Sequence, residues 1–269
     1  MAVVIHPTAQ VAKSAELADG VTVGHCAFIG ENVVIGEGSR VEPFASVQDY
    51  TRMGKNNVIH SYALVGGIPQ DLKFHGEVTA LEMGDNNNVR EFASIHRGTE
   101  GGGGVTRIGN GNLFMAYIHV AHDCDVGSGV IMSNNATLAG HVTVQDGAIL
   151  GGLSAVHQFC RIGKRAFLGG MSGAHQDVPP YMMAVGIRGG LHGPNLVGLR
   201  RMGLPRDAIN AIRAAYRTIW LGGLPRAEAL EQVENEYAAI PQVMEIVDFV
   251  RSSQHGVLAA TSRDGEEHA

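Results

Sequence analysis

The chain has 269 residues, 45% of them hydrophobic, and a formal net charge of −6. This length suits one large domain with a smaller appendage. The acidic balance excludes a general electrostatic attraction to nucleic acid or anionic membrane. No basic leader and no run of 18 apolar residues is present, which predicts a soluble, cytoplasmic protein without an integral membrane segment. The odd number of cysteines, three, predicts buried thiols rather than a disulfide framework.

Apolar residues recur at every sixth position through most of the chain. The members are Ile5, Val11, Leu17, Val23, Ile29, Ile35, Val41, Val47, Met53, Ile59 and Val65, then Met83, Val89 and Ile95, then Ile108, Phe114, Val120, Val126, Met132, Leu138, Val144, Leu150, Val156, Ile162 and Leu168. A helix would need a period near 3.6 and a half-exposed strand would need alternation, so neither explains the pattern. A strict period of six predicts a parallel β-helix with three six-residue sides per coil.

Two excursions interrupt the repeat, near residues 66–82 and 97–107. The first contains Pro69 among mixed charges, and the second contains Gly101 to Gly104, a run that we expect to hold no regular structure. Loops that leave a rigid solenoid commonly carry function. Both excursions are therefore candidate parts of a functional site.

The pattern changes after Gly173. Residues 176–195 are rich in proline and glycine and predict an extended connector. Apolar residues at helical spacing follow, beginning after Pro205, and the polar tail from Ser252 to Ala269 is predicted to be loose. The chain is thus predicted to divide into an all-β solenoid over residues 1–189 and a small C-terminal α-helical domain over residues 190–269.

Histidines gather on one predicted face. Val120, Leu138 and Val156 are 18 residues apart, so their hexads occupy the same side of successive coils. Looping out seven residues of the second excursion places the hexad of Ile95 directly below that of Val120. This arrangement predicts a column of one histidine per coil, with a fifth histidine at the neighbouring corner. The residues are His96, His122, His141 and His157 in the column, and His119 at the corner.

Three chemical interpretations apply to this face. Neutral imidazoles can take up protons near pH 7, and Asp123 directly after His122 is a natural orienting partner for a general base. Zinc is the alternative, because His119 and His122 are followed by Cys124, and γ-class carbonic anhydrases bind zinc between subunits of a solenoid trimer. A non-catalytic scaffold would not cluster histidines. General-base catalysis without metal or bound cofactor is the favoured prediction.

The motifs resemble one enzyme family along almost the whole chain. They read IPQDLKF, SIHRGT, HVAHDC, SNNATLAGHV, GGLSAVHQFC, SGAHQDVPPY and NLVGLRRMG. They are similar to UDP-N-acetylglucosamine 3-O-acyltransferases, which transfer a 3-hydroxyacyl chain from acyl carrier protein to the glucosamine 3-hydroxyl in the first step of lipid A, and hence lipopolysaccharide, biosynthesis. The resemblance implies a left-handed β-helix, a homotrimer with sites between subunits, and the two substrates UDP-N-acetylglucosamine and acyl carrier protein.

The resemblance also implies residue roles. His122 would be the general base, Asp123 its orienting partner, and the backbone N–H of Gly140 the oxyanion donor. Sugar and pyrophosphate contacts would be Asp71, Lys73, His96, His119 and His141. Nucleotide contacts would be His157, Gln158, Asn195 and Arg201. An arginine stripe on the helical domain could meet the acidic carrier protein, or could be a solvated face; it comprises Arg206, Arg213 and Arg217.

Four positions bear on specificity. Gly170 falls where the family limits acyl-chain length, and its missing side chain predicts a chain toward the longer end of the family's range. Val197 departs from relatives that carry an acidic residue, and Ile68 with Pro69 leaves open a 3-hydroxyl or a 3-amino acceptor.

The N-acyltransferase of the same pathway is the nearest rival, but it carries an additional N-terminal domain, whereas the hexads here begin at Ile5.

Overall fold

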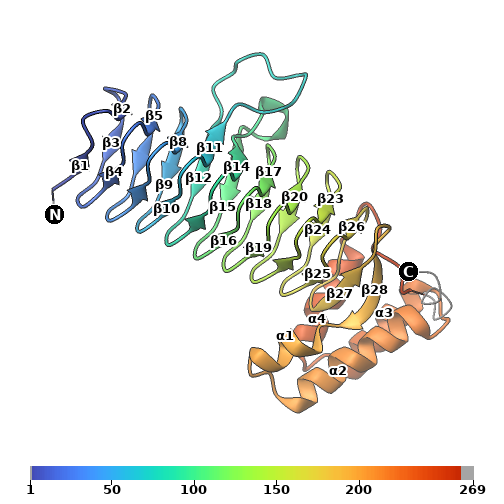
Figure 1. Cartoon of the computed structure of the whole chain (residues 1–269). Helices are drawn as coiled ribbons and strands as arrows, with labels where there is room; N and C mark the ends of the chain where they lie inside the picture. The colour runs from blue at the N-terminus through green and yellow to red at the C-terminus, as the bar shows by residue number, and fades with distance from the viewer. Residues whose placement is uncertain (1, 262–269) are drawn as a thin grey trace.

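The computed structural model describes residues 2–261 and consists of stacked three-sided coils followed by helices (Figure 1). It is a left-handed parallel β-helix, so the predicted fold class is confirmed. The first sheet contains β1 (Val4–Ile5), β4 (Thr22–Val23), β7 (Arg40–Val41), β10 (Val58–Ile59), β13 (Asn88–Val89), β16 (Leu113–Phe114), β19 (Ile131–Met132), β22 (Ile149–Leu150), β25 (Phe167–Leu168), β27 (Met182–Val185) and β28 (Gly190–Pro194).

The other two sides of each coil form two further sheets. The second contains β2 (Gln10–Val11), β5 (Phe28–Ile29), β8 (Ser46–Val47), β11 (Leu64–Gly67), β14 (Ser94–His96), β17 (His119–Val120), β20 (Thr137–Leu138), β23 (Ala155–Val156) and β26 (Gly173–Ala174). The third contains β3 (Glu16–Leu17), β6 (Val34–Ile35), β9 (Thr51–Met53), β12 (Ala80–Met83), β15 (Val105–Ile108), β18 (Asp125–Val126), β21 (Thr143–Val144) and β24 (Arg161–Ile162). Neighbouring strands within the coils pair in parallel at hexad register, for example Val120 with Leu138.

The hexad residues fill the interior. From Val23 to Leu168 they are at most 4% exposed, and burying one Leu or Ile side chain contributes about 1.5–3 kcal/mol. Ile5, in the first coil, is 45% exposed because no coil lies beneath it. The six-residue period therefore maps directly onto one continuous apolar core.

Three buried asparagines continue this interior at the corner where the chain passes from the third sheet to the first. Asn57 Oδ1 accepts the backbone N–H of Asn87, Asn87 Oδ1 accepts that of Asn112, and Asn112 Oδ1 accepts that of Val130. Each amide thus spans one coil spacing and pairs a backbone donor at the turn. This explains how a polar residue can replace a small apolar one in an inward column.

The corners of the coils turn through left-handed backbone. Among residues 2–261, seventeen residues other than glycine have positive φ, including Asp123 at 60° and His141 at 61°. Asp and His tolerate this conformation better than most residues. Asp123 and His141 therefore occupy equivalent corners of adjacent coils.

The two excursions are shorter than predicted because the flanking strands extend into them. Strand β11 continues to Gly67 and β12 begins at Ala80, where it pairs with Val105 of β15. The expectation that Gly101 to Gly104 hold no regular structure is wrong for the first part of this run. A 3₁₀ turn, η1 (Glu100–Gly102), forms there because the Thr99 side chain accepts the Gly102 N–H and Gly103 adopts φ 93° at its end.

The segment after the last coil also differs from the prediction. Instead of an extended connector, β27 and β28 form an antiparallel hairpin that joins the first sheet. The helical part then comprises α1 (Leu196–Arg201), α2 (Arg206–Tyr216), the π-helical turn η2 (Arg217–Leu221), α3 (Arg226–Tyr237) and α4 (Pro241–Arg251). Sequence spacing indicated the later helices but not α1, which is too short to show a period.

Residues 252–261 are not loose, contrary to expectation. Val257 forms a β-bridge with Asp177, Ala260 forms one with Leu191, and Leu258 is buried. The Trp220 indole N–H donates to the Leu258 carbonyl at 3.0 Å, which ties this strand-like segment to η2. The remainder of the predicted tail, 262–269, lies outside the described residues. Within residues 2–261, no helix has the length and apolarity to cross a membrane.

Candidate active site

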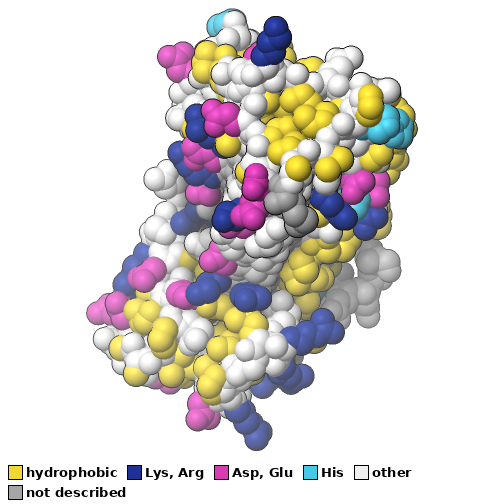
Figure 2. All heavy atoms as spheres, turned by 90° about the vertical axis from the view of Figure 1, so that its left-hand side faces the viewer, with side chains coloured by type: hydrophobic (Ala, Val, Ile, Leu, Met, Phe, Trp, Pro, Cys, Tyr) yellow, Lys and Arg dark blue, Asp and Glu magenta, His cyan; other side chains and the backbone are white. Residues whose placement is uncertain are grey.

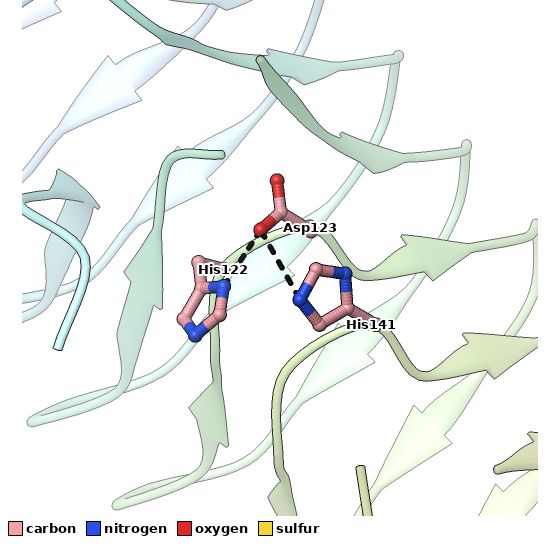
Figure 3. A group of neighbouring side chains, drawn as sticks. All are labelled: His122, Asp123 and His141. Carbon is pink, nitrogen blue, oxygen red and sulfur yellow. Dashed lines mark hydrogen bonds and ion pairs between the residues drawn. The ribbon is translucent and has the colours of Figure 1, made fainter. Parts of the chain in front are cut away.

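His122 and Asp123 form the centre of the candidate site, at the corner between β17 and β18 (Figure 3). His122 Nδ1 lies 2.7 Å from Asp123 Oδ2, and the Asp123 side chain is 1% exposed. A carboxylate can only accept at this distance, so the neutral imidazole carries its proton on Nδ1. The unprotonated Nε2 then points away from Asp123 and can accept a proton from another molecule.

His141 and Gly140 lie one coil further along. His141 Nε2 is 3.7 Å from Asp123 Oδ2, and the rings of His141 and His122 meet edge to face at 5.2 Å. A Cβ atom on Gly140 would lie 2.7 Å from His122 Cε1, so only glycine fits against the ring. Gly140 is buried, and among residues 2–261 its backbone N–H donates no hydrogen bond. This N–H is an unused donor beside the imidazole.

The predicted histidine column is correct in face but wrong in register. Strands β14, β17, β20 and β23 are neighbours in the second sheet, and Ile95 pairs with Val120 as expected. The spacing from His122 to His141 is 19 residues and from His141 to His157 is 16, not 18. His122 is therefore level with Gly140, and His141 stacks on Phe159, with ring centroids 4.5 Å apart.

His96 and His119 form a second pair, with His119 in the same coil as His122 and His96 in the preceding coil. Their rings meet edge to face at 4.9 Å, and Ser94 Oγ lies 2.8 Å from His119 Nδ1. Burial, reinforced by nearby His119 and His122, lowers the pKa of His96 to about 4. Burial and the proximity of His122 also lower the pKa of His119. Both rings are therefore neutral at pH 7 and can donate or accept hydrogen bonds.

The depressed pKa of His96 predicts acid sensitivity of the fold. Between about pH 4 and 6.5 the unfolded chain binds a proton at His96 that the folded chain does not, so stability falls as pH falls through this window. The full slope is about 1.4 kcal/mol per pH unit for one proton. Thermal unfolding of His96→Gln at fixed protein concentration should lose less stability than the parent between pH 6.5 and 4.5. Equal losses in the two proteins would contradict this assignment.

The two excursions face each other across a cleft of about 450 Å³. Asp71 and Lys73 line it from the first excursion, and Thr99 lines it from the second. Thr99 also holds Asp123, since its N–H and hydroxyl each lie 2.7 Å from a carboxylate oxygen. The structure therefore brings Asp71 and Lys73 to the same end of the site as the His122–Asp123 pair.

Asn195, Val197 and Arg201 lie on a different side of the molecule. They line a cavity of about 640 Å³ over the first sheet, together with Phe167 and Met183. Asn195 caps α1 by accepting the Gly198 N–H at 3.0 Å. The His122–Asp123 pair does not line this cavity. Within one chain, therefore, Asn195 and Arg201 do not line a common cavity with His122 and Asp123.

The last coils before the helical part contain His157, Gln158 and Gly170. His157 lines a shallow groove of about 470 Å³ with His175 and Arg188, and its side chain and that of Gln158 are exposed. Gln158 is level with Gly140 in the next coil. Gly170 is exposed, and a Cβ there would meet only Gly152, at 3.4 Å or more.

Sequence reasoning missed three residues that hold this site together. Thr99 and Thr106 both bond Asp123, the latter by accepting its backbone N–H at 2.8 Å. Arg97 is 8% exposed, and its guanidinium lies 5.7 Å from the ring centroids of both Tyr50 and Phe74. Phe74 belongs to the first excursion, so this contact anchors the loop that carries Asp71 and Lys73. The motif SIHRGT contained two of these residues, but only contacts across coils reveal their role.

A metal ion could also be held at this corner. His122, Asp123 and His141 each offer a ligand atom, all within 4.8 Å of one another. The carboxylate oxygens of Asp123, however, already accept hydrogen bonds from Thr99 and His122. Cys124, the third residue of the zinc alternative, is buried in the core and points away from the histidines. The donor set fits a proton-transfer pair better than a zinc centre.

Comparison with known proteins places this geometry in a family. Residues 177–258 match the family described as UDP N-acetylglucosamine O-acyltransferase, domain 2. A Stenotrophomonas maltophilia acyl-(acyl-carrier-protein)–UDP-N-acetylglucosamine O-acyltransferase is 47% identical over 94% of this chain and 97% of its own. The enzyme of that name from Xylella fastidiosa is 46% identical with the same coverage.

Solved structures agree with the sequence relatives. The UDP-N-acetylglucosamine O-acyltransferase of Moraxella catarrhalis superposes with a TM-score of 0.92 at 41% identity, covering 94% of this chain and 99% of that one. The Arabidopsis UDP-N-acetylglucosamine acyltransferase gives 0.89 at 37% identity, covering 96% and 98%. The repeat, the His122–Asp123 corner and these alignments agree, and the chain belongs to the family of acyl-(acyl-carrier-protein)–UDP-N-acetylglucosamine O-acyltransferases.

Proposed function

We propose that this enzyme moves a 3-hydroxyacyl chain from acyl carrier protein to the 3-hydroxyl of UDP-N-acetylglucosamine, with His122 as the general base. The observation that carries the proposal is the 2.7 Å contact between His122 Nδ1 and Asp123 Oδ2, which leaves Nε2 free to take a proton. The names of the relatives supply the donor and acceptor classes and favour the O-acyl reaction over the N-acyl alternative.

Each proton and electron pair in this reaction has a place. His122 Nε2 takes the hydroxyl proton as the sugar oxygen attacks the thioester carbonyl, and Asp123 stabilises the resulting imidazolium. The C–O bond forms, and the carbonyl electrons move onto oxygen as an oxyanion. When the tetrahedral adduct collapses, the C–S bond breaks and the thiolate of the carrier's prosthetic group takes the proton from His122.

Gly140 is the proposed oxyanion donor. Its backbone N–H lies beside the His122 ring and has no acceptor among residues 2–261. An oxyanion that forms next to Nε2 would give this buried donor its partner in the transition state. The lack of a side chain at Gly140 is what allows substrate and imidazole to approach the same N–H.

The remaining predicted contacts support a site shared between subunits. Asp71, Lys73, His96, His119 and His141 lie on the same side as His122 and would contact the sugar and pyrophosphate. The nucleotide contacts Asn195 and Arg201 line a separate cavity over the first sheet. We propose that a homotrimer brings one subunit's cavity to its neighbour's histidines, with His157 and Gln158 completing the nucleotide site. Val197, 57% exposed in that cavity, supplies no carboxylate.

The helical part offers a surface for the carrier protein. Arg206, Arg213 and Arg217 are all exposed on α2 and η2. In Figure 2, basic side chains gather at the lower end of the molecule, at the height of α1 and α2 in Figure 1. This charge complements an acidic partner and would speed its association at low salt.

The cysteines bear on the cellular compartment of the enzyme. Its three thiols are free, as in proteins of a reducing compartment; Cys124 and Cys160 are buried as predicted, whereas Cys26 is exposed. Burial raises the pKa of Cys124 to about 12 and that of Cys160 to about 11, so neither is a nucleophile at neutral pH. We therefore propose a cytoplasmic enzyme at the start of lipid A biosynthesis whose catalysis involves neither cysteine.

The direct test is a transfer assay with purified enzyme. The protein is incubated with UDP-N-acetylglucosamine and carrier proteins bearing 3-hydroxyacyl chains of several lengths, and the sugar nucleotide is analysed by mass spectrometry. An acylated product that alkali cleaves supports an ester on oxygen. An alkali-resistant product formed only from a 3-amino sugar would replace the acceptor, and thioester hydrolysis without sugar acylation would contradict the function.

Gly170 makes a prediction about chain length in the same assay. Because a Cβ at Gly170 would meet only Gly152, the missing side chain leaves space at this corner, and the enzyme should accept chains toward the longer end of the family's range. Gly170→Met should lower kcat/KM for the preferred chain about 10-fold or more and favour a shorter one, since overpacking an apolar site costs about 1–3 kcal/mol. A parent enzyme that prefers short chains would contradict the assignment.

A further inference from the structure

The second excursion closes over the carboxylate of Asp123 and fixes its orientation. Thr99 N–H lies 2.7 Å from Asp123 Oδ1, and Thr99 Oγ1 lies 2.7 Å from Oδ2. The same Oδ2 accepts from His122 Nδ1. Thr99 is 6% exposed, so these hydrogen bonds are shielded from water.

The second partner of Thr99 Oγ1, the Gly102 N–H, shows that the hydroxyl donates to Asp123. Gly102 N–H donates to Thr99 Oγ1 at 3.2 Å, so the single hydroxyl proton of Thr99 is free to point at the carboxylate. An ionised carboxylate can only accept, which agrees with this direction. A chain of hydrogen bonds thus runs from Gly102 through Thr99 to Asp123 and on to His122.

The orientation of the carboxylate matters because both His122 and His141 lie near the same oxygen of Asp123. His141 Nε2 lies 3.7 Å from the same Oδ2 that bonds His122. A small rotation of the carboxylate would move its acceptor from His122 toward His141. Pinning both oxygens through Thr99 keeps the carboxylate on His122.

We propose that Thr99 and Gly102 are positioning residues for acyl transfer, acting through Asp123 on His122. This inference rests on the proposed role of the His122–Asp123 pair and adds the reason for the glycine at position 102. The second excursion is then part of the catalytic apparatus, although neither residue acts on substrate.

Gly102 is needed because Asp123 occupies the space of its missing side chain. A Cβ at Gly102 would lie 2.0 Å from Asp123 Cγ and 2.3 Å from both oxygens. At the neighbouring Gly101, a Cβ would meet nothing within 4 Å, and its backbone is not left-handed. Alanine at these two positions adds the same methyl group with opposite steric consequences.

The first test compares two substitutions at Thr99. Thr99→Val keeps the shape and the backbone donor but removes the hydroxyl, and should lower kcat about 10-fold with KM for the sugar nucleotide changed less than about twofold. Thr99→Ser restores the donor and should retain kcat within about threefold. In an Asp123→Asn background, Thr99→Val should have little further effect, because the two residues act as one unit.

The second test uses the glycine pair. Gly102→Ala should lower kcat at least as much as Thr99→Val, while Gly101→Ala should stay within about twofold of the parent, because only the former displaces the carboxylate. Thermal unfolding of every variant reports on folding. If Gly102→Ala does not fold, the Thr99 pair still decides the question.

The outcomes separate this inference from the function on which it rests. Loss of activity in His122→Ala and Asp123→Asn, with full kcat in Thr99→Val and Gly102→Ala, would overturn the positioning role and leave the general base intact. Full activity in His122→Ala would overturn the general base itself. A Thr99→Val effect confined to KM, or equal in the Asp123→Asn background, would also contradict the inference.

Discussion

Replacing His122 with alanine is expected to lower kcat about 10³-fold, within the 10²- to 10⁴-fold range typical of a lost general base. Asp123 and Gly140 remain in place, so substrate binding should persist and KM should change little. The reason is that Nε2 of His122 is the acceptor that the hydrogen bond to Asp123 leaves free. Initial rates over a range of both substrates, followed by mass spectrometry, would measure the effect.

Controls make this result specific. His25→Ala changes an exposed histidine in an N-terminal coil and should retain the parent rate. Asp123→Asn should also be impaired, and the double variant should be no worse than His122→Ala, since the two groups act together. A His122→Ala enzyme with more than half the parent kcat would exclude the general-base role. Activity lost to a chelator and restored by zinc would instead favour the metal alternative at His122, Asp123 and His141.

Two inactive variants are expected to restore each other's activity when they form mixed trimers. His122→Ala keeps the nucleotide cavity, and Asn195→Ala with Arg201→Ala keeps the histidines. In a trimer with sites between neighbours, each mixed assembly has one interface in which both halves are intact, so about one third of the sites should work. Co-expression with two affinity tags and tandem purification would isolate the mixed trimers, and assays below the parent KM would report binding and chemistry together.

The matched control combines two variants of the same half-site. His122→Ala and Asp123→Asn subunits should not complement, because every site would draw its base and its orienting carboxylate from one impaired subunit. Absence of activity in the first mixture as well would contradict a shared site and would place both halves on one chain. A monomeric or dimeric mass by light scattering would contradict the trimer directly.

The β-helix fold and the stacking of its coils could be predicted because they depend on a local rule. Every sixth side chain must be apolar if three flat sides are to enclose a narrow core, and the rule holds at Val120, Leu138 and Val156 as it does elsewhere. The pairing of Ile95 with Val120 followed from the same rule once the excess residues were looped out. The family resemblance supplied the handedness, which spacing alone does not contain.

Predictions failed where a contact joins residues distant in sequence. The hairpin of β27 and β28 pairs with the last coil instead of running as a connector, and residues 257–260 bridge back to Asp177 and Leu191. Neither segment has a periodic pattern in its sequence. Each is stabilised by pairing with residues distant in the chain, at the C-terminal edge of the solenoid. The 3₁₀ turn in the glycine run likewise depends on Thr99, whose side chain caps it.

The candidate site shows the same division. The sequence alone predicts that the histidines share one face, because residues 18 apart occupy equivalent positions in successive coils, and it shows directly that Asp123 follows His122. The contacts between individual side chains follow only from the three-dimensional arrangement of the coils. Because His141 lies 19 residues after His122 rather than 18, Gly140 is the residue beside the His122 ring and Phe159 stacks on His141, while the second excursion brings Thr99 onto the carboxylate of Asp123. Hydrogen bonds act over a few tenths of an ångström, a precision that a six-residue period does not carry.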